Sequence, residues 1–138
     1  KLTIGVLNRI YELADRPIVK TEFSNNLHRA EGRVPFHYIV QLDEIIAKSL
    51  NMGIASQKVK SEYENIIKIF GGEFKILMEK DLEELSREGV EPKIIGGIAA
   101  LRAGKIKFEP AGYDGEYGNM VFADSENIQK FTTQKSLF

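Results

Sequence analysis

The sequence predicts a mainly α-helical fold with a small β-hairpin near its C-terminal end. Over residues 42–104, apolar side chains recur at spacings of three and four, which is the period of helices that bury one face. After Gly104 the pattern changes to two short runs typical of strands, residues 106–108 and 119–122, separated by a glycine-rich loop. The 138 residues make one ordinary domain that buries roughly two thirds of its unfolded surface.

The segments before the helical part differ from it in pattern. Residues 1–17 predict an amphipathic helix, with Ile4, Leu7, Ile10 and Tyr11 on one face, that ends at Pro17. Residues 18–41 show no sustained period and predict a connector, which we expect to be mobile because connectors of this length are uncommon in compact domains.

Glycine, proline and aspartate divide the helical part, residues 42–104, into helices. The first two helices are separated by a turn near Gly53, and the second ends at a glycine pair. A short turn over residues 73–79 precedes two further helices. The residues expected at these boundaries are Gly71, Gly72, Asp81 as a cap, Gly89, Pro92 and Gly104. Residues 105–123 then form the predicted hairpin, and residues 124–138 are polar enough to predict a flexible tail.

Composition excludes several classes of function. The chain has 19 Lys and Arg against 20 Asp and Glu, so no overall positive field attracts nucleic acid and any such contact must be local. Without cysteine it has no disulfide or thiolate metal site, and no apolar run approaches the roughly 20 residues that span a bilayer. We therefore expect a cytoplasmic protein without membrane contact. Because it begins at Lys1 without a signal pattern, we expect a piece of a longer protein.

The turn at Gly53 is the strongest candidate binding site. The first backbone N–H groups of a helix have no internal partner and carry a partial positive charge, so a tight turn into a helix can bind phosphate. Residues 50–56 have this form and resemble the helix-hairpin-helix motif of DNA-repair proteins, although alanine stands at the position of its second glycine. The predicted DNA phosphate site is Gly53, Ile54, Ala55 and Ser56 with Lys58 and Lys60. The alternative is an ordinary helix corner.

A second junction, residues 87–92, repeats the glycine and apolar residue of the first. Here Glu91 replaces the second glycine, and together with Glu88 it would repel a phosphate. We therefore interpret this copy as structural, and the two halves together predict a helix-hairpin-helix-like bundle linked through residues 70–74.

The remaining candidates are weaker. Tyr113 and Tyr117, in the loop over residues 112–118, could contact bases or backbone, whereas Asp114 and Glu116 alone are too few ligands for a cation. His28 and His37 have no catalytic or metal-binding partner at a suitable spacing, so no catalytic residue and no metal site are predicted. The chain also lacks a phosphate-binding loop for ATP hydrolysis.

Four segments in order resemble one family: residues 1–16, residues 33–37 (Arg-Val-Pro-Phe-His), residues 42–53 and the loop 112–118. They are similar to the C-terminal region of endonuclease Q, and residues 1–16 resemble the helix that continues from its zinc module. This is a family of archaeal and bacterial proteins with a polymerase-and-histidinol-phosphatase domain, some of them labelled ATP-dependent DNA helicase-related. The resemblance implies a missing metal-dependent nuclease domain and a missing zinc module. Members of the family nick DNA beside deaminated bases. The divalent metal and the zinc belong to those domains, so no cofactor is expected here.

The tail adds a candidate partner. Gln134 and Leu137, with Phe138 at the end, resemble the start of the sliding-clamp binding motif, whose final aromatic pair is absent; a chance match is the alternative. The sequence thus predicts a non-catalytic DNA-binding or scaffold domain of a repair endonuclease. The alternatives are a module that braces the nuclease and zinc domains and recruits the clamp, and an accessory domain of a helicase-related protein.

Overall fold

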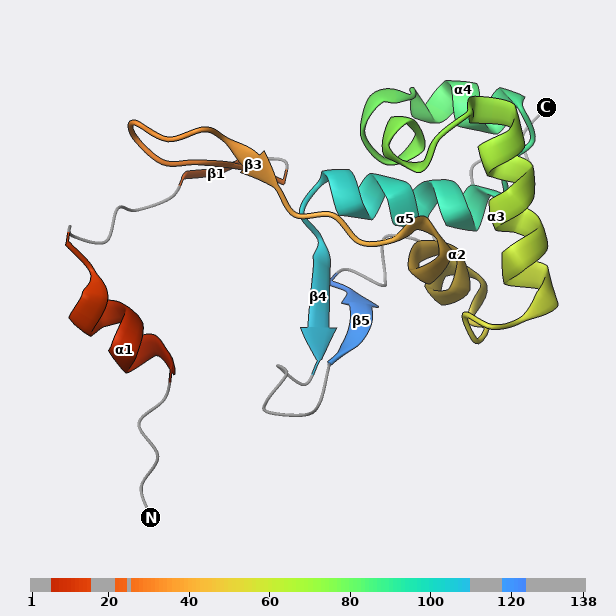
Figure 1. The fold of residues 1–138 in the computed structure, drawn as a ribbon. Helices are drawn as coiled ribbons and strands as arrows, with labels where there is room; N and C mark the ends of the chain where they lie inside the picture. Colours follow the sequence, from red (N-terminus) through yellow and green to blue (C-terminus); the bar gives the residue numbers. More distant parts are fainter. Residues whose placement is uncertain (1–5, 16–21, 25, 110–117, 124–138) are drawn as a thin grey trace, which may run out of the picture.

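The computed structural model describes residues 6–15, 22–24, 26–109 and 118–123. Four α-helices and one π-helix form a helical block: α2 (Leu42–Leu50), α3 (Gln57–Phe70), η1 (Lys75–Glu79), α4 (Leu82–Arg87) and α5 (Pro92–Arg102). In Figure 1, α5 runs through the middle of this block with α2, α3 and α4 around it. The described part of the chain is therefore mainly α-helical, as the sequence predicts.

The helical block holds the hydrophobic core. Its side chains come from every helix of the block, and the apolar stripes found in the sequence supply most of them, which is why the pattern predicted the helices correctly. Side chains less than 2% exposed are Leu42, Ile45, Ile46, Val59, Ile66, Ile76, Leu77, Leu85, Ile94 and Ile98.

The closest packing is between α2 and α5. A Cβ added at Gly97 of α5 would lie 2.5 Å from Ser49 Oγ and 2.8 Å from Ile45 Cγ2, both on α2. Only a residue without a side chain allows the two helices to approach so closely. The Ser49 hydroxyl is buried at this crossing and has no hydrogen-bond partner among the described residues.

The helix ends confirm most of the predicted boundaries. Gly71 caps α3 in the left-handed conformation with φ of 80°, and Gly89 and Gly104 follow α4 and α5 with φ of 82° and 68°. Pro92 occupies the first turn of α5. Asp81 takes the N-cap position of α4 as predicted, but its side chain accepts no capping hydrogen bond.

Two contacts between segments distant in sequence tie the block together. Glu73 accepts hydrogen bonds from the Leu42 backbone N–H at 2.6 Å and from the Tyr63 hydroxyl at 3.1 Å. The first N–H group of α2 therefore has an acceptor 31 residues further along the chain. The Arg102 guanidinium donates to the carbonyl oxygens of Ile76, Leu77 and Lys80 at 2.6–2.8 Å and so closes the end of η1. Burial lowers the pKa of Arg102.

The predicted C-terminal hairpin is confirmed. Strand β4 (Ile106–Glu109) pairs antiparallel with β5 (Asn119–Phe122), with Ile106 opposite Phe122. Met120 of β5 is buried and belongs to the core of the helical block, so the hairpin is attached to the helices by packing as well as by chain connection.

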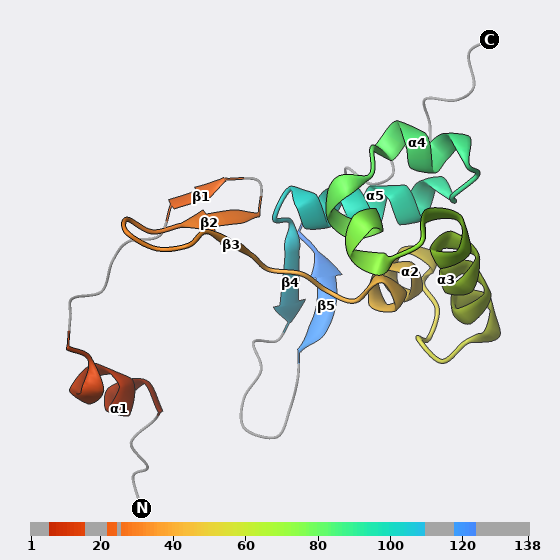
Figure 2. The same cartoon turned by 45° about the horizontal axis from the view of Figure 1, so that its top comes forward.

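The sequence pattern over residues 18–41 indicates only a connector, and the structure adds three short strands there. They are β1 (Glu22–Ser24), β2 (Leu27–Arg29) and β3 (Phe36–His37), paired antiparallel in the order β1-β2-β3. Strands of two or three residues are too short to display an alternation of period two, which is why the pattern does not reveal them. Figure 2 shows this sheet beside the start of β4.

The N-terminal helix α1 (Val6–Leu13) lies apart from the rest of the structure in both views (Figures 1 and 2). Its apolar residues Ile10, Tyr11 and Leu13 are 55–65% exposed. The predicted amphipathic helix is therefore present, but its apolar face packs against nothing in the described part of the chain.

Candidate nucleic-acid interface

The predicted phosphate site is the turn of residues 51–56 between α2 and α3. Asn51 ends α2 in the left-handed conformation, with φ of 53°, and the Met52 N–H returns to the Ala47 carbonyl at 2.9 Å. Ser56 then begins α3, and its hydroxyl accepts a hydrogen bond from the Val59 N–H at 3.3 Å. The turn is therefore set by caps at both of its ends, and this fixes where its backbone amides lie.

The amides of the turn differ in whether they are free. The N–H groups of Gly53, Ile54 and Ala55 have no acceptor among the described residues, and all three residues are exposed. The Ser56 N–H, in contrast, donates to the Gly53 carbonyl at 2.9 Å. No acidic side chain of the described chain caps the three free amides, so they remain available to an anion.

The two predicted lysines are present beside the turn but are paired with carboxylates. Lys58 Nζ lies 2.6 Å from Glu62 Oε1, and Lys60 Nζ lies 3.9 Å from Glu64 Oε1, each one turn further along α3. The hydrogen bond from Lys58 to Glu62 is the main reason that the pKa of Lys58 is raised. A phosphate would therefore compete with Glu62 for Lys58. These carboxylates were not among the predicted site residues, although their spacing of four residues from each lysine on a helix is a sufficient signal.

Gly53 is not required by the fold. Its φ is not positive, and a Cβ added there would meet nothing within 4 Å. Glycine at such a position either is incidental or allows another molecule to approach the backbone closely.

The two turns of the block differ in what their apolar residue does. In the first, Met52 and Ile54 are each 47% exposed, whereas Val90 of the second is 6% exposed and belongs to the core. The Val90 N–H is also taken up by the Leu85 carbonyl at 3.0 Å. Glu91 of the second turn lies near enough to Lys58 to contribute, as a minor cause, to its raised pKa. The apolar side chains of the first turn therefore face solvent, whereas Val90 of the second turn packs into the core.

The other predicted contact residues are not brought together with this turn. Tyr113, Tyr117 and the tail residues Gln134, Leu137 and Phe138 lie outside the described residues. His37 Nδ1–H donates to the Asn26 carbonyl at 3.0 Å, and the His28 ring packs against Phe36 and Tyr38, so both histidines have structural contacts.

Two features are absent from the described residues. Within them, no group of three or more His, Cys, Asp or Glu side chains is arranged to hold a metal ion. No helix there is both long and apolar enough to cross a membrane.

Comparison with known proteins finds a matching family and a protein with a similar sequence. Residues 41–105 match the family described as the MJ0043 C-terminal domain. Over 118 residues the chain is 36% identical to protein MJ0043 of Methanocaldococcus jannaschii, a match that covers 86% of this chain and 14% of that protein.

Two solved structures are similar over nearly all of the chain. One is the lesion-specific endonuclease PfuEndoQ from Pyrococcus furiosus, with a TM-score of 0.67, 30% identity, and coverage of 93% of this chain and 28% of that one. The other is endonuclease Q in complex with a 27-mer duplex substrate that has an abasic lesion at the active site, with a TM-score of 0.68, 30% identity, and coverage of 91% and 28%. The chain thus spans less than a third of either protein. The resemblance indicated by the sequence segments is confirmed: nearly all of this chain is similar in structure to a region of endonuclease Q.

Proposed function

We propose that this chain is a DNA-binding, non-catalytic domain of a DNA repair endonuclease that acts on deaminated bases. The similarity to a lesion-specific endonuclease, and to an endonuclease Q bound to a DNA duplex, supports DNA as the partner. Catalysis, with its divalent metal, and the zinc module would lie in other domains of a longer protein.

The observation that carries the proposal is the exposed turn between α2 and α3. The free amides of Gly53, Ile54 and Ala55 point to a phosphate site of the helix-hairpin-helix kind. The Ile54 side chain beside them is exposed, so it could contact a sugar or the edge of a DNA groove. Lys58 and Lys60 supply charge once the phosphate displaces Glu62 and Glu64.

The second turn would then serve packing. Its buried Val90 and its carboxylates at Glu88 and Glu91 support a bundle in which the first turn binds phosphate and the second packs against the core.

The test is charge reversal at the turn. The double variant Lys58→Glu and Lys60→Glu should weaken duplex binding equally for all sequences and flatten its salt dependence, because phosphate contacts carry no base information. A matched control is Lys68→Glu with Lys75→Glu, which changes the same charge at exposed positions away from the turn. Equal affinities of the two double variants, measured by fluorescence anisotropy in a salt titration, would reject the proposal.

The second candidate function is an interaction module, and the exposed apolar face of α1 favours it. Ile10, Tyr11 and Leu13 are more than half exposed, and burial of such a face against the nuclease or zinc domain would remove apolar surface from water. Size-exclusion chromatography of the chain mixed with those domains tests this role. The same experiment with the sliding clamp tests the tail motif at Gln134, Leu137 and Phe138.

A further inference from the structure

A pocket separate from the α2–α3 turn lies between the three-stranded sheet and strand β4. Its volume is about 410 Å³, within the range of roughly 300–1,000 Å³ typical of small-ligand sites. The walls are almost entirely apolar and come from four segments: β2, the chain after β3, the end of α5, and β4. The principal wall residues are His28, Tyr38, Val40, Leu101, Ile106 and Phe108.

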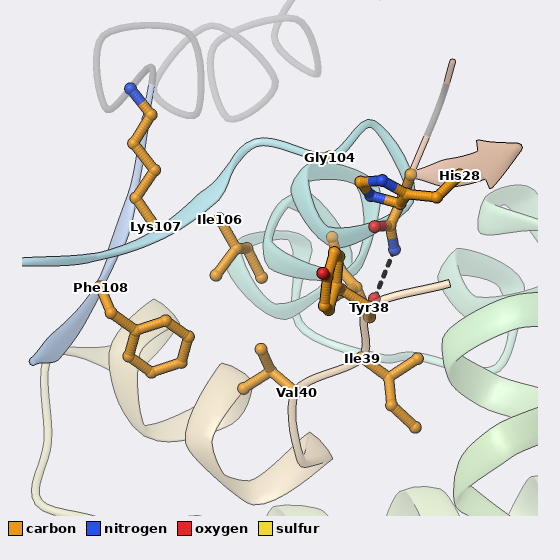
Figure 3. A pocket seen from close by; sticks show the side chains of 10 residues that line it. His28, Tyr38, Ile39, Val40, Gly104, Ile106, Lys107 and Phe108 are labelled. Carbon is orange, nitrogen blue, oxygen red and sulfur yellow. Dashed lines mark hydrogen bonds between the residues drawn. The ribbon is translucent and has the colours of Figure 1, made fainter. Parts of the chain in front are cut away.

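The side chains of β4 alternate across this pocket. Figure 3 shows Ile106 and Phe108 extending toward Val40 and Tyr38, whereas the Lys107 side chain leads away from them. Successive side chains of a strand point to opposite faces, so Lys107 reaches solvent at the rim while its two neighbours form the wall. Lys107 is exposed, and no carboxylate of the described residues lies within ion-pair distance of it.

The Tyr38 ring is held in place although it is 64% exposed. It meets the His28 ring edge-on at 4.7 Å and the Phe36 ring edge-on at 5.4 Å, and His28 and Phe36 are stacked at 5.0 Å with 12° between their planes. The Tyr38 carbonyl accepts a hydrogen bond of 2.6 Å from the side-chain amide of Asn26, which is buried (Figure 3). An aromatic ring fixed in this way binds a partner at a small cost in conformational entropy.

We propose that this pocket binds one unstacked nucleobase of an unpaired DNA strand. The base would lie between the exposed rings of Tyr38 and Phe108, and Lys107 at the rim would contact the adjoining phosphate. The choice of ligand rests on the DNA-binding function proposed above; the site itself does not include the α2–α3 turn.

Three properties of the pocket fit a nucleobase. The fixed ring of Tyr38 and the exposed ring of Phe108 offer stacking surfaces, and every base has a face that stacks on an aromatic ring. The volume accommodates a single planar ring system together with its sugar. Lys107, which has no ion-pair partner among the described residues, lies outside the apolar walls, which is where a phosphate attached to a buried base would emerge. A paired base inside a duplex cannot enter, so the pocket selects unpaired nucleotides.

The experiment uses the whole chain and short oligonucleotides that carry one 2-aminopurine, whose fluorescence is quenched by stacking. We expect quenching with a single strand, and with a duplex in which the 2-aminopurine is bulged, but not with the fully paired duplex. Tyr38→Ala and Phe108→Ala should each weaken single-strand binding about ten- to a hundredfold and abolish the quenching. Phe74→Ala, which removes an exposed phenylalanine from the helical block, should change neither.

Two further variants separate stacking from loss of structure. Tyr38→Phe keeps the ring and should retain the quenching, so a loss caused by the missing ring is distinguished from a loss caused by disturbed packing. Lys107→Gln should keep the quenching and reduce the salt dependence by about one phosphate contact.

The outcomes also separate this proposal from the proposed phosphate site. Gly53→Ala should weaken duplex binding and leave the quenching by single strands intact. If duplex binding is strong but no oligonucleotide is quenched, or Tyr38→Ala and Phe108→Ala bind single strands as the unmodified chain does, the pocket proposal is wrong and the proposed function stands. If those two variants change only self-association or binding to another protein, the surface is a protein docking site and the pocket proposal is likewise refuted.

Discussion

Replacing Gly53 by alanine separates binding from folding at the α2–α3 turn. Residue 53 has no positive φ, and an added Cβ would contact nothing within 4 Å. The substitution should therefore leave the free energy of unfolding unchanged or raise it by about 0.4–1 kcal/mol, since alanine restricts the unfolded chain more than glycine does.

The same methyl group would stand in the way of a phosphate that approaches the amides of Gly53 and Ile54. Loss of one hydrogen bond between a backbone amide and a charged acceptor costs about 1.5–3 kcal/mol, which corresponds to roughly a 10- to 100-fold weaker Kd for a duplex. Fluorescence anisotropy with a labelled duplex measures the affinity, and urea denaturation measures the stability of the same preparation.

The matched control is Gly72→Ala. Gly72 also has no positive φ and nothing within 4 Å of an added Cβ, but it lies beyond the end of α3, away from the turn. If Gly53→Ala and Gly72→Ala bind the duplex equally well, close approach of a phosphate to the turn is excluded. If Gly53→Ala alone lowers the stability, our account of the turn's geometry is wrong.

Three other predictions concern residues whose partners the structure identifies. Glu62→Gln should strengthen duplex binding about two- to fivefold at low salt and steepen its salt dependence, because Lys58 loses its competing carboxylate; an unchanged anisotropy titration would contradict this. Arg102→Met should lower the free energy of unfolding by about 2 kcal/mol, because three carbonyls at the end of η1 lose their donor, and a urea midpoint equal to that of the unmodified chain would refute it. Gly97→Ala should destabilise by about 1–2 kcal/mol, the steric cost against Ser49 outweighing the better helix propensity of alanine, and the double variant with Ser49→Ala should recover part of the loss in the same assay.

The parts of the fold that the sequence predicted are those determined by local pattern. Apolar spacing located the helices of residues 42–104, and Gly71 was identified as a helix end because left-handed backbone favours glycine. Asp81 shows the limit of such rules, since the residue type and the position are right but the side chain makes no capping hydrogen bond.

The parts that could not be predicted depend on partners distant in the chain. Arg102 binds backbone carbonyls 22 to 26 residues away, and carbonyls have no signature in a sequence. Glu73 completes the start of α2 across 31 residues, a contact that only the folded block creates. For the same reason, the aromatic contacts of His28 with Tyr38 appear only once β2 and β3 are paired.

The two proposed contacts with DNA differ in what they can read, and this argues for a division of work between them. The amides of the α2–α3 turn would bind a phosphate, which is the same at every nucleotide, so this site supplies position without selection. The pocket beside Tyr38 would accept only a base that is out of its stack, so it responds to the state of the strand rather than to its sequence. Unstacking costs least where a base is damaged or mismatched. A domain with both sites would therefore be retained longest on DNA whose pairing is already disturbed, and this preference should disappear when Tyr38 is replaced by alanine but persist, at lower overall affinity, when Gly53 is replaced.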